Sequence, residues 1–357
     1  MSSPNTSLIQ ILSNWIAGQT PTASQWQQLA TAALASPRQA KAFGITSGNV
    51  EEMIQARSHL FQAVYPEVLS LPSFRSTVED NPQAKIILSL WNLWLPLAMQ
   101  LAFYRQQLGR PLIQGILGVQ GTGKTTLATV LSLIVTHLGY RTLSLSLDDL
   151  YKTYTERQRL QQQDPRLIWR GPPGTHDIEL GVQLLDQLRQ PNPLHQILVP
   201  RFDKSAQGGA GDRTTPEQVE NIDIVLFEGW FVGVRPINPS VFDASTPAPI
   251  NTPADRDFAR DMNERLKDYL PLWERLDRLM VLYPTNYRLS QQWRRQAEQQ
   301  MKATGKSGMT DTQINDFVNY FWKSLHPELF ITPLIKKPNW VDLAIEINPD
   351  HTAGAIY

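Results

Sequence analysis

The residue types and spacing that most clearly predict chemistry in this chain lie in one segment, Gly118–Thr125. Its sequence, G-V-Q-G-T-G-K-T, matches the phosphate-binding pattern G-x-x-x-x-G-K-S/T at every fixed position. Glycines let backbone N–H groups curl around phosphate oxygens, and the helix that follows such a loop directs the positive end of its dipole at them. In this pattern Lys124 reaches the β- and γ-phosphates, and the hydroxyl of Thr125 coordinates Mg²⁺. The segment therefore predicts a binding site for ATP with Mg²⁺.

The sequence around this segment supplies the elements that the chemistry needs. The apolar run Leu112–Leu117 comes directly before it and predicts a strand. Apolar residues then recur at helical spacing from Leu127 to Leu138, and Gly139 suits the position after a helix end. We expect the nucleotide to contact the loop and the first turn of this helix, at Gly118, Gln120, Gly121, Thr122, Gly123, Lys124, Thr125 and Thr126.

Two neighbouring carboxylates follow the next predicted strand, which runs from Thr142 to Leu147 and leads into Asp148 and Asp149. Ligands of open parallel sheets bind at the carboxyl ends of the strands, so this is where an acceptor hydroxyl should lie. An aspartate is ionised at neutral pH and can accept the hydroxyl proton during phosphoryl transfer. We expect Asp148 to take that role and to be a candidate metal ligand, whereas Asp149 suits a helix N-cap as well as a substrate contact.

A third carboxylate, Glu228, follows the apolar strand predicted from Ile222 to Phe227. This arrangement is similar to the magnesium-binding acid of phosphate-loop proteins, with Glu where Asp is usual. We expect Glu228 to reach Mg²⁺ directly or through water. A phosphate loop alone indicates nucleotide binding and leaves the reaction open, but the guanine-reading N-K-x-D motif of GTPases is absent from the sequence. The acids therefore favour a kinase.

The remaining pattern predicts an α/β protein with a P-loop NTPase fold, in which a parallel sheet is flanked by helices. Residues 1–109 have helical spacing and form a predicted helical N-terminal region that packs on a kinase domain of residues 110–357. Its Trp91 and Trp94 are expected to be packing groups. Short apolar runs alternate with helical segments after that, which is typical of βαβ units. The candidate strands are Leu112–Leu117, Thr142–Leu147, Gln196–Val199, Ile222–Phe227, Leu279–Tyr283 and Leu343–Ile347.

Composition narrows the class of protein further. The 33 basic and 33 acidic residues balance, so no overall field attracts nucleic acid or an anionic membrane. The absence of cysteine excludes disulfides and cysteine nucleophiles. The longest apolar run, Ile86–Met99, is shorter than the roughly 20 residues of a membrane span. We expect no secretory signal and no transit peptide, and predict a monomeric cytoplasmic protein with a small-molecule substrate.

Several segments together resemble a known family. The chain is similar to the uridine kinase, phosphoribulokinase and pantothenate kinase branch of P-loop kinases, and within it to the D-glycerate 3-kinases. The matching segments lie in roughly the last 250 residues and are Gly118–Thr125, Ser146–Tyr151, Arg170–Asp177, Pro200–Ser205 and Phe227–Trp230, with Trp293–Glu298 and Gly305–Thr310 more particular to glycerate kinases. The resemblance implies transfer of the ATP γ-phosphate to the 3-hydroxyl of D-glycerate, with Mg²⁺, as in the last step of photorespiration.

The resemblance also implies roles for residues outside the loop. Asp177 and Asp203 are expected to hold substrate hydroxyls, and His176 and Arg170 to border the pocket. The substrate carboxylate is expected to bind one or more of three cations, which the sequence does not rank: Arg201, Lys204 and Arg213. Asp149 and Tyr151 complete the candidate substrate contacts.

A helix predicted at about residues 288–304 resembles the lid of this kinase branch and carries Arg294 and Arg295. Lid arginines neutralise charge on the transferring phosphoryl group. Adjacent helical residues point about 100° apart, so we expect one arginine to reach the phosphates and the other to form an ion pair, with Glu298 as its natural partner. Two alternatives stay open: a kinase for another small alcohol or a nucleoside, and a non-catalytic regulator that binds nucleotide.

Overall fold

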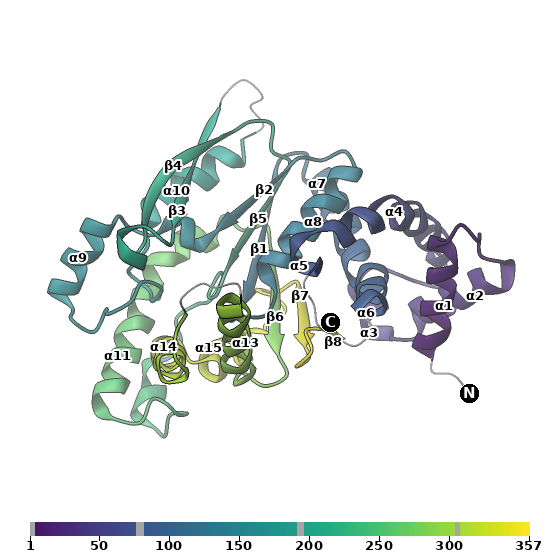
Figure 1. The fold of residues 1–357 in the computed structure, drawn as a ribbon. Coiled ribbons are helices and arrows are strands. Elements are labelled where there is room, and N and C mark those ends of the chain that lie inside the picture. The colour runs from purple at the N-terminus through teal and green to yellow at the C-terminus, as the bar shows by residue number, and fades with distance from the viewer. Residues whose placement is uncertain (1–3, 76–81, 191–195, 304–307) are drawn as a thin grey trace.

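The computed structural model describes residues 4–75, 82–190, 196–303 and 308–357. Its centre is a six-stranded sheet with the order β2-β5-β1-β6-β7-β8, in which β8 pairs antiparallel with β7 and the other strands are parallel. Figure 1 shows helices on both faces of this sheet and a bundle of N-terminal helices to one side. The strands of the sheet are β1 (Leu112–Gly118), β2 (Thr142–Ser146), β5 (Ile224–Gly229), β6 (Arg278–Pro284), β7 (Leu343–Ile347) and β8 (Ala353–Ile356).

The predicted α/β class with a mainly parallel sheet is confirmed, and the structure corrects three details. The strand β2 ends at Ser146, and Leu147 begins a short 3₁₀ helix, η2 (Leu147–Leu150). The strand β5 runs on to Gly229, so Glu228 belongs to the strand instead of following it. The edge strand β8 has no counterpart among the predicted strands, because its four residues, A-G-A-I, carry little apolar pattern.

The prediction that Gln196–Val199 belongs to the parallel sheet is wrong. Strand β3 (Ile197–Asp203) instead pairs antiparallel with β4 (Asp212–Val219) in a separate two-stranded sheet. Strands of a parallel sheet are buried on both faces and are therefore apolar throughout. The polar end of β3 and the sequence of β4, D-R-T-T-P-E-Q-V, do not meet that condition, so this pair lies at the margin of the molecule (Figure 1).

Helices make up most of the remaining chain. Before the sheet they are α1 (Pro4–Ile16), α2 (Ala23–Leu34), α3 (Pro37–Ala42), α4 (Val50–Ser70), α5 (Pro72–Arg75), α6 (Pro82–Ser89), the π-helical segment η1 (Leu90–Trp94) and α7 (Leu95–Leu108). Between and after the strands they are α8 (Lys124–His137), α9 (Tyr154–Gln163), α10 (Ile178–Leu188), α11 (Pro253–Arg265), α12 (Leu270–Trp273), α13 (Leu289–Ala303), α14 (Asp311–Ser324) and α15 (Pro327–Leu334). Short 3₁₀ turns occur at η3 (Gln207–Gly209), η4 (Pro239–Asp243) and η5 (Leu266–Tyr269).

The N-terminal helices share a hydrophobic core with the sheet. That core contains Phe61 of α4 and Trp91 of η1 together with Leu131 of α8 and Ile116 of β1. Trp91 is 1% exposed, which confirms its predicted packing role. A second core covers the other face of the sheet and joins α10 to α11, α12 and α14. The helical region and the sheet therefore form one packed body.

One continuous helix of the described residues, Pro82–Leu108, is long and apolar enough to cross a membrane by length and composition. It consists of α6, η1 and α7. Of its most apolar window, 56% is buried inside the protein, and Leu90, Leu95 and Leu101 are almost fully buried. This burial is typical of a core helix, and packing inside the protein accounts for the apolar sequence of this segment.

Parallel pairing brings three strand ends to the same edge of the sheet. Ile116 of β1 and Ser146 of β2 both pair with Glu228 of β5. The phosphate loop after β1, the turn η2 after β2 and the end of β5 are therefore neighbours, although more than 100 residues separate the first from the last. This edge contains the candidate site.

Candidate active site

The predicted phosphate loop connects β1 to α8 with the backbone geometry that anion binding needs. Gly121 and Gly123 have φ angles of 82° and 83°, a region that side chains other than glycine rarely adopt. The hydroxyl of Thr122 donates to the carbonyl oxygen of Val119 at 2.8 Å, which closes the turn. Helix α8 begins at Lys124, so its free backbone N–H groups open onto the loop.

Lys124 lies between the loop and the carboxylates of the neighbouring strands. Its Nζ donates to the carbonyl oxygen of Val119 at 3.3 Å. Burial lowers the pKa of Lys124, while the negative charges of Glu228 and Asp148 raise it. These electrostatic contacts place Lys124 close to Glu228 and Asp148, with the ammonium of Lys204 also near.

Glu228 and Thr125 place two side-chain oxygens next to each other beside the loop. The Thr125 hydroxyl lies 3.4 Å from Oε1 of Glu228. Among the residues that the structure describes, no group of three or more His, Asp or Glu side chains is placed to hold a metal ion. A hydroxyl with one or two carboxylates nevertheless fits Mg²⁺, because that ion usually keeps several waters and takes its other ligands from substrate phosphates.

Asp148 and Asp149 face different partners although they are adjacent. Asp148 has a side chain that is 27% exposed, and its Oδ2 lies 2.6 Å from Nζ of Lys204. Burial raises the pKa of Asp148, but the charge of Lys204 and hydrogen bonds from Lys204 and Tyr151 outweigh it and keep the pKa below its usual value. Asp148 is therefore an ionised acceptor at neutral pH.

Asp149 is the third residue of η2 in a capping box whose N-cap residue is Ser146. Its Oδ2 accepts a hydrogen bond from the backbone N–H of Ser146 at 3.0 Å and another from Arg201 at 2.9 Å. Burial raises the pKa of Asp149, against the lowering effect of these bonds. Of the two roles that the sequence left open for Asp149, the N-cap position is wrong because Ser146 occupies it, and the substrate contact stays a prediction.

The three candidate cations for a substrate carboxylate differ in how many contacts they already make with other residues of the protein. Arg201 binds Asp149, Glu217 and the carbonyl oxygen of Ser144. Arg213 binds Asp177 at 2.8 Å and the carbonyl oxygen of Tyr151 at 2.9 Å. Lys204 is 63% exposed and pairs with Asp148. Both arginines hold structure together, whereas Lys204 can turn toward a ligand.

The other predicted substrate contacts surround Tyr151. His176 is 1% exposed, stacks on the Tyr151 ring with centroids 4.5 Å apart, and places Nδ1 2.7 Å from the Tyr269 hydroxyl. Burial lowers the pKa of His176 to about 3, so it is neutral at physiological pH. Burial and the charge of Asp148 raise the pKa of Tyr151 well above its ordinary value, so its hydroxyl stays protonated and donates to Asp148. His176 therefore positions Tyr151, which in turn contacts Asp148.

Asp177, Asp203 and Arg170 each contact other residues of the protein. Asp177 caps α10 through the N–H of Leu180 at 3.1 Å. The exposed Asp203 accepts from the N–H and hydroxyl of Ser205 at 2.8 and 2.6 Å. Arg170 donates to two carbonyl oxygens of the glycine-rich segment between β3 and β4, those of Gly209 and Ala210.

A residue that the sequence did not indicate, Arg157 of α9, binds the same glycine-rich segment at Ala210 and Gly211. Arg157 and Arg170 therefore both hydrogen-bond to the backbone of the glycine-rich segment.

The two arginines of the predicted lid helix bind neighbouring elements. Arg294 forms the predicted pair with Glu298 at 2.5 Å, and its guanidinium lies 5.2 Å from the centroid of the Phe317 ring. Arg295 donates to the side-chain oxygen of Asn315 at 2.8 Å. In this structure both arginines thus face α14, and a contact with phosphate stays a prediction. Residues 304–307, which include the end of the predicted helix and part of the motif Gly305–Thr310, lie outside the described residues.

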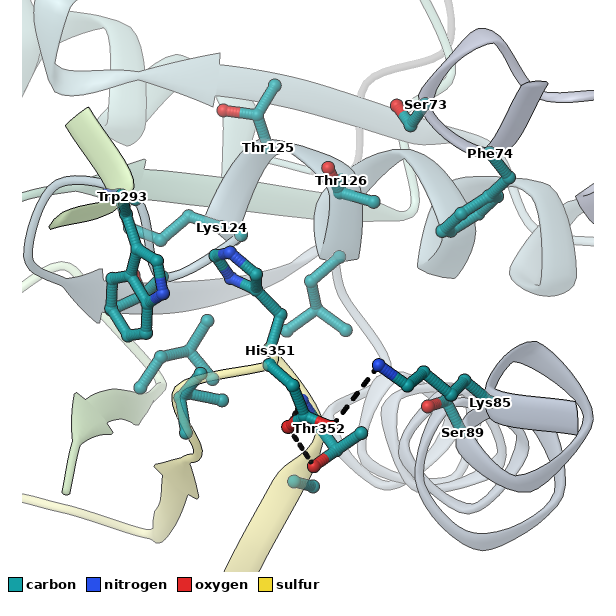
Figure 2. Close-up of a pocket in the computed structure, with 18 of the residues that line it drawn as sticks. Ser73, Phe74, Lys85, Ser89, Lys124, Thr125, Thr126, Trp293, His351 and Thr352 are labelled. Carbon is teal, nitrogen blue, oxygen red and sulfur yellow. Dashed lines mark hydrogen bonds and ion pairs between the residues drawn. The ribbon is translucent and has the colours of Figure 1, made fainter. Parts of the chain in front are cut away.

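A cavity of about 540 Å³ adjoins the loop, and Asp148, Asp149 and Glu228 are not part of its lining. It is lined by the loop and start of α8, by α13, by the connection between β7 and β8, and by α5, α6 and η1 (Figure 2). Its aromatic residues are Phe74, Trp94, Trp293 and His351; the sequence predicted Trp94 to be a packing group and assigned no role to the side chains of the other three. Trp293 is the first residue of the glycerate-kinase-like motif Trp293–Glu298, so that motif was the sequence feature that could have indicated this cavity.

Comparison with known proteins shows which kinases the chain is similar to. No family model matches the chain. The chain is 32% identical over 221 residues to the uncharacterized kinase mug58 of Schizosaccharomyces pombe. The match covers 60% of this chain and 79% of the yeast protein. It is also 32% identical over 253 residues to the chloroplastic D-glycerate 3-kinase of Arabidopsis thaliana, 67% of this chain and 53% of the plant protein. The chain thus spans about half the length of the plant relative.

A solved structure supports the same relationship. The D-glycerate 3-kinase from Cryptococcus neoformans var. grubii superposes with a TM-score of 0.65 at 27% identity, over 74% of this chain and 98% of that chain. With the loop, the acids and the parallel sheet, this likeness defines the protein as an ATP-dependent P-loop kinase. The chain belongs to the kinase family of the fission-yeast protein, to which the D-glycerate 3-kinases are related.

Proposed function

We propose that this kinase transfers the γ-phosphate of ATP to the 3-hydroxyl of D-glycerate and releases 3-phosphoglycerate and ADP. The observation that carries the proposal is the contact between Asp148 and Lys204 at 2.6 Å, beside the phosphate loop. An ionised carboxylate next to an exposed ammonium matches an acceptor that carries a hydroxyl and a carboxylate. The similarity to two D-glycerate 3-kinases points to the same acceptor.

Lys204 is the proposed partner of the substrate carboxylate. Arg201 and Arg213 are already held by acidic side chains and backbone oxygens, so recruiting either would break several hydrogen bonds. Lys204 exchanges one carboxylate, that of Asp148, for another. The exchange frees Asp148 to accept a hydrogen bond from the acceptor hydroxyl, with the Tyr151 hydroxyl as its second donor.

The reaction follows from this arrangement as a direct in-line transfer. The backbone N–H groups of the loop and Lys124 hold the triphosphate. Thr125 and Glu228 would hold Mg²⁺, which would supply positive charge to the phosphate oxygens when bound. The acceptor oxygen forms a bond to the γ-phosphorus, the bond to the bridging oxygen of ADP breaks, and the hydroxyl proton passes to Asp148.

The proposal is tested by coupled measurement of ADP release with D-glycerate, L-glycerate, pantothenate and uridine as acceptors. We expect D-glycerate to give the highest kcat/KM, because its carboxylate and hydroxyl match Lys204 and Asp148. Faster ADP release with pantothenate or uridine reassigns the acceptor. Tight ATP binding without release of ADP above background in any reaction favours a nucleotide-binding regulator.

A further inference from the structure

The cavity beside the phosphate loop has two aromatic walls from distant parts of the chain. On one side Trp293 and His351 stack with ring centroids 4.7 Å apart. On the other side lie Phe74 and Trp94, with centroids 5.6 Å apart. Figure 2 shows Phe74 and His351 on opposite sides of the space, with Thr126 of the first turn of α8 between them. One wall therefore belongs to the kinase core and the other to the N-terminal helices.

The position of the cavity decides which part of a nucleotide it can receive. Its lining includes Lys124, Thr125 and Thr126 and none of Asp148, Lys204 and Glu228. The γ-phosphate must lie beside Asp148 and Glu228, because the acceptor binds at Asp148. The opposite end of the triphosphate therefore points into the cavity, and that end carries the nucleoside.

The cavity has the size and surface that a nucleoside requires. Its volume of about 540 Å³ lies within the range of roughly 300–1,000 Å³ typical of small-molecule sites. Aromatic faces bind bases by stacking. Hydroxyls of Ser73, Ser89 and Thr352 in the same lining offer hydrogen bonds to a ribose or to the edge of a base.

The two walls are joined by an ion pair across the cavity. Nζ of Lys85 on α6 lies 3.3 Å from Oδ2 of Asp350 in the connection between β7 and β8 (Figure 2). Oδ1 of Asp350 accepts from the N–H and hydroxyl of Thr352 at 3.2 and 2.7 Å. Between them His351 has a φ angle of 62°, a strained conformation for a residue with a side chain, and such residues cluster at ligand sites.

We infer that α5, α6 and η1 form one wall of the site for the nucleoside half of ATP, with Phe74 packing on the base from that side. The inference rests on the proposed function because it takes ATP as the nucleotide and places its γ-phosphate beside the acids. It gives the N-terminal helices a part in binding, whereas every segment that carries the family resemblance begins at Gly118 or later.

The test compares a ligand that has a nucleoside with one that lacks it. Full-length protein is titrated calorimetrically with MgADP and with magnesium tripolyphosphate, which engages the loop alone. We expect Phe74→Ala to raise the Kd for MgADP roughly 5- to 100-fold, the usual effect of removing a base-stacking ring. Ser73→Trp, at an exposed position in the lining, should fill the cavity and act in the same direction. Neither change should alter the Kd for tripolyphosphate, which also reports correct folding.

Phe103→Ala is the matched control, because Phe103 lies on α7, is 54% exposed and does not line the cavity. The inference is overturned if Phe74→Ala and Ser73→Trp bind MgADP as tightly as the wild type, or if Phe103→Ala weakens MgADP equally. The titrations contain no acceptor. A protein that shows the expected pattern but phosphorylates no D-glycerate therefore contradicts the proposed function alone.

Discussion

Lys204 holds its ammonium 2.6 Å from Asp148, across 55 intervening residues, in the position where an acceptor is expected to bind. This contact lowers the pKa of Asp148 against the effect of burial. It joins the proposed base to the proposed carboxylate-binding group, so a change at Lys204 should alter the titration of Asp148.

Lys204→Met should move the acidic limb of the pH profile of kcat/KM for D-glycerate to higher pH. Removing the ammonium raises the pKa of Asp148, so protonation inactivates the base at a higher pH than in the wild type. The loss of a charged hydrogen bond should also raise KM for D-glycerate about 10- to 100-fold. Lys204→Arg keeps the charge and serves as the control; an acidic limb that stays at the wild-type pH in Lys204→Met contradicts the pairing.

Asp148→Asn should reduce kcat about 10²-fold or more and leave the KM for ATP nearly unchanged, because it removes a proton acceptor and no phosphate contact. The same change at the neighbouring residue, Asp149→Asn, is the control. An asparagine oxygen can still accept the N–H of Ser146, so we expect a loss of kcat below about tenfold. Steady-state kinetics with both substrates varied measures kcat and the KM for ATP of each variant. Equal losses of kcat in the two variants argue against a special role for Asp148.

Glu228→Gln should raise the Mg²⁺ concentration required for half-maximal activity by about 10- to 100-fold, since a charged ligand becomes neutral. Thr125→Val, which removes the hydroxyl 3.4 Å from Glu228, should act in the same direction. Thr125→Ser retains the hydroxyl and is the control. Titration of Mg²⁺ at fixed ATP measures the effect, and an unchanged requirement in Glu228→Gln removes this residue from the metal site.

Gly121→Ala should weaken MgADP binding more than Gly123→Ala, although both glycines have positive φ angles. A Cβ on Gly121 would lie 2.6 Å from Cβ of Trp293, whereas a Cβ on Gly123 has no atom within 4 Å. Both variants carry the left-handed strain of about 1–2 kcal/mol, and the first also displaces α13. Calorimetric Kd values test this difference; equal losses mean that the contact with Trp293 is unimportant for binding.

Asp255→Asn should destabilise the protein at pH 7 and have a much smaller effect near pH 2. Burial raises the pKa of Asp255, but hydrogen bonds from Lys323 and Thr252 outweigh it and lower the pKa to about 2. The charged form therefore contributes stability above its unfolded pKa of about 3.9, and the contribution is lost as the pH falls toward 2. We expect a loss of about 1–3 kcal/mol in the free energy of unfolding at pH 7.

Thermal unfolding at the two pH values measures this effect. Asp257→Asn is the control, because Asp257 is 65% exposed and its pair with Arg260 lies at the surface, where ion pairs contribute little. A decrease in Tm that is as large at pH 2 as at pH 7 contradicts the role of the Asp255 charge.

The amino-acid sequence by itself determined the phosphate loop, five of the six strands in the central sheet, and the meeting of Lys124, Asp148 and Glu228 at one edge. These features follow from local pattern and one general rule. Apolar runs specify strands, glycines specify the loop, and the carboxyl ends of parallel strands lie side by side.

Only the tertiary structure decided how the side chains divide their roles. The sequence favoured Asp148 as the base and left the role of Asp149 open, and the turn η2 directs Asp149 to Ser146 and leaves Asp148 for Lys204. The removal of β3 from the parallel sheet, and the approach of the N-terminal helices to the loop, depend on pairing and packing between segments far apart in the chain. Periodicity and motif spacing describe neighbours along the chain, whereas these contacts are set by which distant surfaces bury one another.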